Sequence, residues 1–173
     1  VFRQAMESLI VANAHRIIAG EEPELSSKTS DFFMLQNQNS NTAAELVVDL
    51  AAKRLPDAYG FKPFNDIQVL APSKKGELGT IELNKKLQLA LNPNEDNSEE
   101  MTINGKTFRK GDKVMQVKNN YDIPWFKENG DTGAGIFNGD IGILESVSRK
   151  NNMIKVVFDD KTAVYDKDNA IDL

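Results

Sequence analysis

Met101-Thr102-Ile103-Asn104-Gly105-Lys106-Thr107-Phe108 is the stretch that decides the fold of the second half of this chain. Two short segments flank Asn104-Gly105, and both of these residues accept the positive φ angles that a two-residue hairpin turn requires. The stretch therefore predicts a β-hairpin. Gly105-Lys106-Thr107 also looks like the end of a phosphate-binding P-loop, but that motif needs a glycine five positions before Gly105 and a helix after the threonine. Glu100 stands there instead, so the hairpin is preferred and no complete nucleotide site is expected in this chain.

Short strands and tight turns continue beyond the hairpin. Alternating patterns predict strands at residues 113–117, 142–147, 153–158 and 162–165. Strands this short and this closely spaced are typical of a small all-β barrel of SH3-like size. Residues 122–135, which include three glycines, are expected to form a long flexible loop. Trp125 lies within it and either stacks on a ligand or anchors the loop.

The first half of the chain alternates helical and strand patterns. Thr42 and Glu45 match a capping box, Gly20 and Pro56 are expected to end helices, and Asn92-Pro93 stops the last one. The order α-β-α-β-α predicts an α/β fold with a mostly parallel sheet covered by helices. Residues 94–100 are polar and acidic and are expected to be a linker. The expected helices are 2–19, 42–55 and 80–91, and the expected strands are 32–35 and 67–70.

Composition limits the possible functions. The 173 residues contain no cysteine and one histidine, so a zinc site built from Cys and His is excluded. The net charge of -5 argues against non-specific coating of DNA, but residues 101–118 carry a local excess of lysine and arginine. No signal peptide and no apolar run of membrane-spanning length is seen, and a cytoplasmic location without membrane contact is expected.

Arg3 is the sharpest candidate for chemistry. An arginine at the start of a helix can direct its guanidinium fork at phosphate oxygens, and the helix N-terminus adds a positive field. In a two-lobed ATPase such an arginine reaches across a cleft to the γ-phosphate. Pattern alone favours the alternative of a surface arginine, so the role of Arg3 depends on further evidence.

Three segments carry groups that suit nucleic acid. Residues 71–80 follow a predicted strand and open a helix, with Ser73 and Lys74 offering a hydroxyl and an ammonium to phosphate. An ordinary strand-helix connection is the alternative. Asn119-Asn120-Tyr121 joins two amides to an aromatic ring that can stack on a base. Phe137-Asn138-Gly139-Asp140 is better interpreted as a tight turn than as a direct contact.

Taken together, segments along the chain resemble the RecD-like family of superfamily 1 DNA helicases, which includes the alpha subunit of exodeoxyribonuclease V. Each segment is weakly specific, but they occur in family order and span nearly the whole chain. They are Val1-Phe2-Arg3-Gln4-Ala5, Ile10-Val11-Ala12-Asn13-Ala14-His15, Val69-Leu70-Ala71-Pro72, Gly79-Thr80 with Leu83-Asn84 and Leu87-Gln88, Leu91-Asn92-Pro93, Gly111-Asp112-Lys113-Val114-Met115-Gln116 with Asn119-Asn120-Tyr121, and Phe137-Asn138-Gly139-Asp140-Ile141-Gly142.

The resemblance implies a domain plan and a set of site residues. Residues 1–93 would be part of a second RecA-like lobe, 94–100 a linker, 101–168 an inserted SH3-like barrel, and 169–173 the return towards the lobe. Arg3 matches the arginine that meets the ATP γ-phosphate, with Gln4 beside it. The resemblance places the remaining residues near single-stranded DNA: Pro72, Ser73, Lys74, Asn84, Asn119, Asn120, Tyr121, Asn138 and Gly139.

The family motifs that hold ATP and Mg²⁺ do not occur in this chain. The resemblance implies a full-length parent that binds ATP and Mg²⁺ and moves along single-stranded DNA, 5′ to 3′, in recombination and repair. Its other helicase lobe, and exonuclease subunits in some members, would be partners. The chain alone is expected to bind no cofactor or metal and to show neither ATP hydrolysis nor unwinding.

Two other functions remain open at the level of sequence. The chain could be a non-catalytic module whose SH3-like barrel binds protein or nucleic acid. It could also belong to a small-molecule enzyme that uses the loop at residues 76–80.

Overall fold

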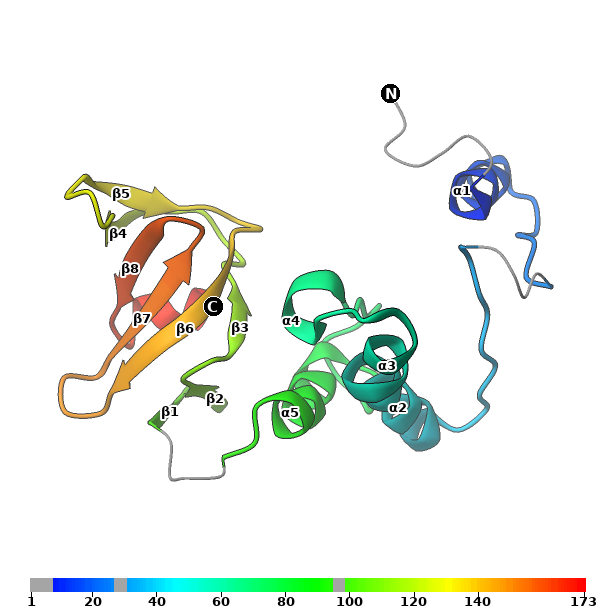
Figure 1. The fold of residues 1–173 in the computed structure, drawn as a ribbon, viewed down its shortest axis with the longest axis horizontal. Coiled ribbons are helices and arrows are strands. Elements are labelled where there is room, and N and C mark those ends of the chain that lie inside the picture. Colours follow the sequence, from blue (N-terminus) through cyan, green and yellow to red (C-terminus); the bar gives the residue numbers. More distant parts are fainter. Residues whose placement is uncertain (1–7, 27–30, 95–98) are drawn as a thin grey trace. The chain divides into compact units, whose positions relative to one another are not determined.

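The structure, a computed structural model, describes residues 8–26, 31–94 and 99–173. The chain divides into two compact units, Val1–Ala43 and Ala44–Leu173. Figure 1 shows the elements in sequence colours, with the α-helices preceding the strands along the chain. The helical elements are α1 Leu9–Ala19, α2 Ser40–Asp49, a π-helical segment Leu50–Arg54, α3 Leu55–Tyr59, α4 Pro63–Asp66, α5 Thr80–Leu91 and a 3-10 helix Asn169–Asp172.

Helix α1 ends as its sequence predicts. Gly20 adopts a left-handed conformation with φ 78°, which glycine reaches without steric cost. Its N–H donates to the carbonyl of Ile17 at 3.1 Å. The buried Asn13 side chain pairs with both backbone groups of Glu24, at 2.7 and 2.9 Å, and so fixes the segment that follows the helix. The predicted helix start at Phe2 lies outside the described residues.

The second helix is present, but two of its predicted signals were wrong. Its N-cap is Asn39, whose Oδ1 accepts the N–H groups of Asn41 and Thr42 at 2.9 and 3.3 Å. Asn39 and Thr42 are both capping residues, and the earlier one takes the role, so Thr42 and Glu45 form no capping box. Pro56 does not end the helix either, since it lies in the first turn of α3.

A π-helical turn explains how the chain passes Pro56. Proline has no N–H to donate and crowds the carbonyl four residues before it. The chain widens over Leu50–Arg54, where the N–H of Leu55 bonds to the carbonyl of Leu50 five residues back. Helix α3 then continues to Tyr59 and stops at Gly60, which has φ 72°. The widened turn therefore accommodates the proline without a break.

The predicted parallel sheet is not found in the described parts of the chain. Residues 32–35 and 67–70 belong to no strand, and every strand pairing that the structure records is antiparallel. An extended segment becomes a strand only when a neighbour completes its hydrogen-bond ladder. Neither segment forms a strand ladder within the described residues, and Leu70 is largely exposed. The apolar pattern indicated an extended backbone but could not supply the partner strand.

Helix α5 has the predicted bounds, Thr80–Leu91. Leu83 is buried together with Ala44 of α2 and Ala51 of the π-helical segment. The small side chains at 44 and 51 allow close approach of the helix backbones. Helix α5 contacts the π-helical segment in this part of the chain.

The β domain occupies residues 100–173, which we call the barrel. Six strands form one antiparallel sheet in the order β3-β6-β7-β8-β4-β5, and β1 pairs with β2 as a separate hairpin. This arrangement is consistent with the predicted SH3-like barrel. The strands are β1 Glu100–Ile103, β2 Lys106–Arg109, β3 Lys113–Met115, β4 Asn120–Phe126, β5 Thr132–Ile136, β6 Ile141–Ser148, β7 Met153–Phe158 and β8 Lys161–Tyr165.

The hairpin that the opening sequence stretch predicts is confirmed. Met101 pairs with Phe108, and Ile103 pairs with Lys106. Asn104 and Gly105 form the turn with φ values of 49° and 78°. Met101, Ile103 and Phe108 are all buried, so the hairpin closes one end of the barrel core.

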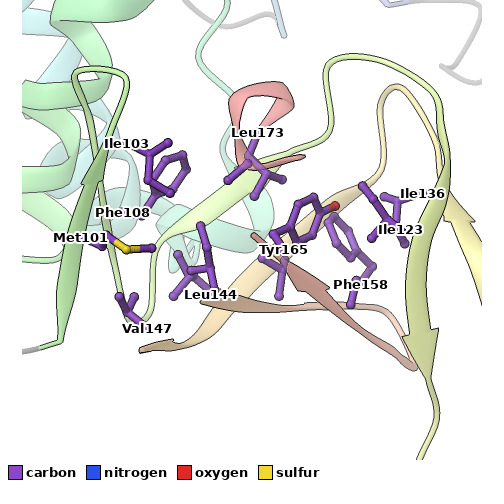
Figure 2. Packing of buried hydrophobic residues seen from close by; sticks show 14 residues of the cluster. Met101, Ile103, Phe108, Ile123, Ile136, Leu144, Val147, Phe158, Tyr165 and Leu173 are labelled. Atoms are coloured by element: carbon purple, nitrogen blue, oxygen red, sulfur yellow. The ribbon is translucent and has the colours of Figure 1, made fainter. Parts of the chain in front are cut away.

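One apolar core fills the barrel. Alternate residues of the strands point inward, as the buried positions along β7 show. Figure 2 shows the side chains of the hairpin and of the curved sheet converging on this core, with Tyr165 in the middle. Ala170 and Leu173 of the C-terminal segment are also part of it. The core members are Met101, Ile103, Phe108, Ile123, Ile136, Leu144, Val147, Ile154, Val156, Phe158, Ala163, Tyr165, Ala170 and Leu173.

The prediction of a long loop over residues 122–135 was wrong, because these residues form the β4–β5 hairpin. The glycines that indicated a loop serve packing instead. A Cβ atom on Gly133 would lie 2.4 Å from the ring of Trp125, so the indole lies flat on the bare backbone of the neighbouring strand. The ammonium of Lys161, which lies on β8, is 5.0 Å from the centroid of the Trp125 ring. Trp125 therefore anchors this part of the barrel, which answers the question that the sequence left open.

Candidate nucleic-acid interface

The proposed ATP contacts cannot be placed, because Arg3 and Gln4 lie outside the described residues. The other candidates fall into two groups. One group lies before and within α5, and the other lies where β3 leads into β4 and where β5 leads into β6.

The loop before α5 folds back over the start of that helix. The carbonyls of Ser73 and Lys74 accept the N–H groups of Thr80 and Ile81 at 3.0 and 3.2 Å. A Cβ atom on Gly79 would lie 2.6 Å from the backbone of Lys75, so only glycine permits this close return. The N–H groups of Thr80 and Ile81 are therefore occupied, and the exposed side chains are the groups that this loop offers to a phosphate.

Pro72, Ser73, Lys74 and Asn84 are all exposed. The Ser73 hydroxyl donates to the carbonyl of Lys75 at 3.0 Å, which shapes the loop. Asn84 lies one turn into α5, on the same side of the helix as Gln88 because they are four residues apart. The ammonium of Lys74 is the clearest phosphate-binding group of this set.

The second group contains residues that the structure holds close together. The N–H of Asn138 donates to Oδ1 of Asn119 at 2.9 Å, which ties the start of β4 to the turn between β5 and β6. Gly139 has φ 95°, and the predicted turn at Asn138-Gly139 is confirmed. The side chain of Asn120 is occupied by hydrogen bonds within the barrel. Its Nδ2 donates to Oδ1 of Asn169, and its Oδ1 accepts from the N–H of Asp122.

An exposed aromatic pair lies beside these amides. The rings of Tyr121 and Phe137 meet edge to face, with centroids 5.6 Å apart and an interplanar angle of 72°. Tyr121 is 68% exposed and Phe137 is 42% exposed. Phe137 packs against the tyrosine ring, and the large exposed fraction of Tyr121 leaves ring surface on which a base can stack. The sequence analysis placed Phe137 in a turn but did not identify it as a partner of Tyr121.

A fully buried glutamine holds this surface in place. All four hydrogen-bonding groups of Gln116 are used. Its backbone N–H donates to Asp140 and its carbonyl accepts from Gly139, at 2.9 and 2.8 Å. Its Nε2 donates to the carbonyl of Lys118 at 2.8 Å, and its Oε1 accepts from the hydroxyl of Tyr165 at 2.9 Å. Gln116 thus joins the barrel core to the two segments that carry the exposed amides and rings.

Replacing Tyr165 with phenylalanine tests this brace. The change leaves Oε1 of Gln116 buried without a donor, so the free energy of unfolding should fall by about 1–3 kcal/mol.

Burial, with Asp140 nearby, raises the pKa of the Tyr165 phenol. The unfolded chain would release this proton near pH 10 while the folded chain keeps it, so wild-type stability should decline as the pH rises above about 10.

Urea unfolding of the full chain, followed by fluorescence of Trp125, measures both effects, since this is the only tryptophan. The Tyr165→Phe variant should lose the part of the alkaline decline that Tyr165 causes. If the free energy of unfolding fell equally steeply above pH 10 in the wild type and in Tyr165→Phe, the raised pKa of Tyr165 would be contradicted.

Two lysines, Lys118 and Lys106, interact with the carboxylate of Asp172. Lys118 pairs with Asp172 at 2.9 Å and stays 71% exposed. Burial lowers the pKa of Lys106, Asp172 opposes that shift, and the positive charge of Lys74 adds to it. Lys106 and Lys118 were visible in the sequence only as part of a basic stretch.

Other kinds of site find less support. Two depressions on the barrel have volumes of about 320 and 90 Å³, and no residue of the loop at 76–80 lines either of them. Among the described residues, no group of His, Asp and Glu is placed to hold a metal ion. Within the same residues, no helix combines the length and apolarity needed to cross a membrane.

Comparison with known proteins agrees with the geometry. Residues 83–158 match the family model of the ATP-dependent RecD-like DNA helicase SH3 domain. The chain is also 32% identical over 145 residues to the ATP-dependent RecD2 DNA helicase of Deinococcus radiodurans. That alignment covers 83% of this chain and 17% of the relative, so the chain spans less than a fifth of the length of this curated protein.

The family match includes most of α5 and the strands β1 to β7. The longer alignment covers more of the chain than the barrel alone. On these two findings, the chain belongs to the RecD-like DNA helicases and contains their SH3 domain.

Proposed function

We propose that this chain is part of an ATP-dependent DNA helicase and that it supplies a contact surface for single-stranded DNA. The observation that carries the proposal is the exposed Tyr121–Phe137 pair, which Gln116 braces and which lies beside the Asn119–Asn138 contact. Aromatic faces bind bases of any sequence, as a protein that moves along DNA requires. The name of the curated relative supports the wider activity.

The lysines complete the proposed surface. Lys118 would contact a DNA phosphate beside the aromatic pair. Lys74 and Lys106 would contact further phosphates of the DNA backbone. Each phosphate contact releases a counterion, so binding should weaken as salt increases. Pro72, Ser73 and Asn84 would line the same path, and Asn120 would support it from within the barrel.

The rest of the mechanism is proposed for the full-length protein. Residues 1–93 would belong to a RecA-like lobe, and Arg3 and Gln4 would meet ATP and Mg²⁺ held by another lobe. Closure of the lobes around ATP would advance the protein 5′ to 3′ in recombination and repair. The protein would act in the cytoplasm, with exonuclease subunits as possible partners, and the present chain alone would hydrolyse no ATP.

Tyr121→Ala in the full-length protein is the direct test of the DNA surface. The variant should bind oligothymidylate about 10-fold more weakly, because stacking one base on an aromatic ring contributes about 1–3 kcal/mol. Phe126→Ala is the matched control, since Phe126 is an exposed aromatic at the opposite end of β4. Fluorescence anisotropy measures both affinities. Equal affinities for the wild type and Tyr121→Ala, or an equal loss in both variants, would reject the proposed surface.

A further inference from the structure

A buried carboxylate joins helix α5 to the barrel. Asp112 is only 8% exposed. Its Oδ2 accepts from Nε2 of Gln88 at 2.6 Å and from the backbone N–H of Arg109 at 2.8 Å. Its Oδ1 accepts from Nδ2 of Asn92 at 2.8 Å. Three donors from two different elements therefore converge on one side chain, which we call the Asp112 clamp.

The clamp holds α5 at its C-terminal end. Gln88 and Asn92 are four residues apart and so project from one side of the helix. Gln88 also donates to the carbonyl of Thr107 at 2.9 Å, and Asn92 donates to the carbonyl of Lys110 at 2.9 Å. Both side chains thus bridge from the helix to β2 and the β2–β3 connection.

Arg109 reinforces the same contact from the barrel side. Its guanidinium is almost fully buried, bonds to the carbonyl of Asn92 at the end of α5, and pairs with Glu100 at 2.9 Å. A positive group suits the negative end of a helix dipole. Gly111, with φ 90°, lets the chain turn between Arg109 and the clamp. The polar contact therefore includes three charged groups from the barrel, Asp112, Arg109 and Glu100, and two amides from the helix side.

Burying these charged groups costs free energy, which is not needed merely to hold two elements together. Burial raises the pKa of the Asp112 carboxyl, although its hydrogen bonds oppose the shift. Apolar side chains of similar volume often stabilise such a contact equally well, whereas a buried polar network fixes one orientation. All three partners of Asp112 are donors, so only an ionised carboxylate satisfies them together.

We infer that Asp112 is a positioning residue that locks α5 to the barrel, so that a displacement of α5 during the motor cycle is transmitted to the DNA contacts on the barrel. The inference rests on the proposed function for its mechanical consequence. Its structural part, a fixed orientation of α5 on the barrel, stands on the Asp112 clamp alone.

Asp112→Asn is the sharpest variant, because it keeps the shape of the side chain and replaces one acceptor oxygen with a donor. That donor must face one of the three N–H groups, so at least one bond is lost. Gln88→Ala is a milder second variant that removes a single donor if Asp112→Asn folds poorly. Glu82→Gln is the control on the same helix, where Glu82 forms only an exposed pair with Lys85.

Two measurements on the full-length helicase test the inference. Spin labels at Leu89 on α5 and Met153 on β7, both exposed, report the distance distribution between helix and barrel. The chain itself has no cysteine that would compete for labelling. The second measurement is the number of base pairs opened per ATP hydrolysed, which reports coupling rather than binding.

In Asp112→Asn the distance distribution should broaden clearly, and base pairs opened per ATP should fall about fivefold, while DNA-stimulated ATP turnover stays within about twofold. Gln88→Ala should show the same pattern more weakly, and Glu82→Gln should match the wild type. An unchanged distribution, or parallel losses of unwinding and ATP turnover, would overturn the inference. A broadened distribution alongside a Tyr121→Ala variant with normal DNA affinity would instead reject the proposed function and leave the structural part standing.

Discussion

Replacing Arg3 with alanine in the full-length protein is expected to reduce ATP turnover by about 10³-fold or more. An arginine that stabilises charge on the transferred γ-phosphate contributes about 10³–10⁵ to the rate. Binding of single-stranded DNA should remain within about threefold, because the proposed contacts on the barrel do not include this residue. Steady-state hydrolysis at saturating DNA, with the anisotropy assay alongside, measures both.

Arg16→Ala is the matched control for Arg3. Arg16 lies in α1, is exposed, and donates a 3.4 Å hydrogen bond to the carbonyl of Glu22. Its loss should leave ATP turnover unchanged. If Arg3→Ala also turned over ATP normally, the chain would be better described as a non-catalytic binding module, and the assignment of residues 1–93 to a motor lobe would be wrong.

The second large effect concerns the fold of the barrel. Ile154→Ala should lower the free energy of unfolding by about 2–5 kcal/mol, because it removes a fully buried side chain and leaves a cavity. Met153→Ala, one residue earlier on β7, should change it by no more than about 0.5 kcal/mol, because Met153 is half-exposed on the opposite face. Urea unfolding followed by Trp125 fluorescence compares the two variants.

This pair tests the register of the sheet as well as its stability. Ile154 pairs with Val147 on β6 and with Tyr165 on β8, so its inward position depends on both pairings. A shift of one residue would exchange the two faces. Equal losses in the two variants, or a larger loss for Met153→Ala, would contradict the described register.

The sequence predicted those features that short stretches determine. Asn104-Gly105 identified the first hairpin because few other residue pairs accept two consecutive positive φ angles. Helix α5 was predicted with its observed bounds, since Gly79 precedes it and Asn92-Pro93 follows it. The Asn138-Gly139 turn was predicted for the same local reason, and its proximity to Asn119 is consistent with the family resemblance.

Features that depend on distant residues were missed. Gly133 indicated a loop, although its bare backbone receives the ring of Trp125 from the neighbouring strand. Residues 67–70 have an apolar strand pattern, but pattern alone does not supply a ladder partner. The Asp112 clamp joins residues 20 and 24 positions apart, and no local spacing predicts that Gln88 and Asn92 share one carboxylate.

Phe137 shows how the candidate site differs from its prediction. Residues 137–140 were interpreted as a turn, which is correct, but the phenylalanine at its start supports Tyr121 from outside the strand pairing. The buried Gln116 beneath them is polar, and its sequence neighbours give no sign that it would be buried. Only the fold shows that these residues and Tyr165 act as one supported surface.

The most direct measurement is crosslinking to single-stranded DNA from defined positions on the barrel. A photoreactive phenylalanine analogue is placed at Tyr121, or at Phe126 at the far end of the same strand, in the full-length protein. Position 121 should crosslink to oligothymidylate, with a yield that falls as salt increases. Position 126 should give little product. Crosslinking from 126 with none from 121 would show that the DNA passes elsewhere and would contradict the assigned surface.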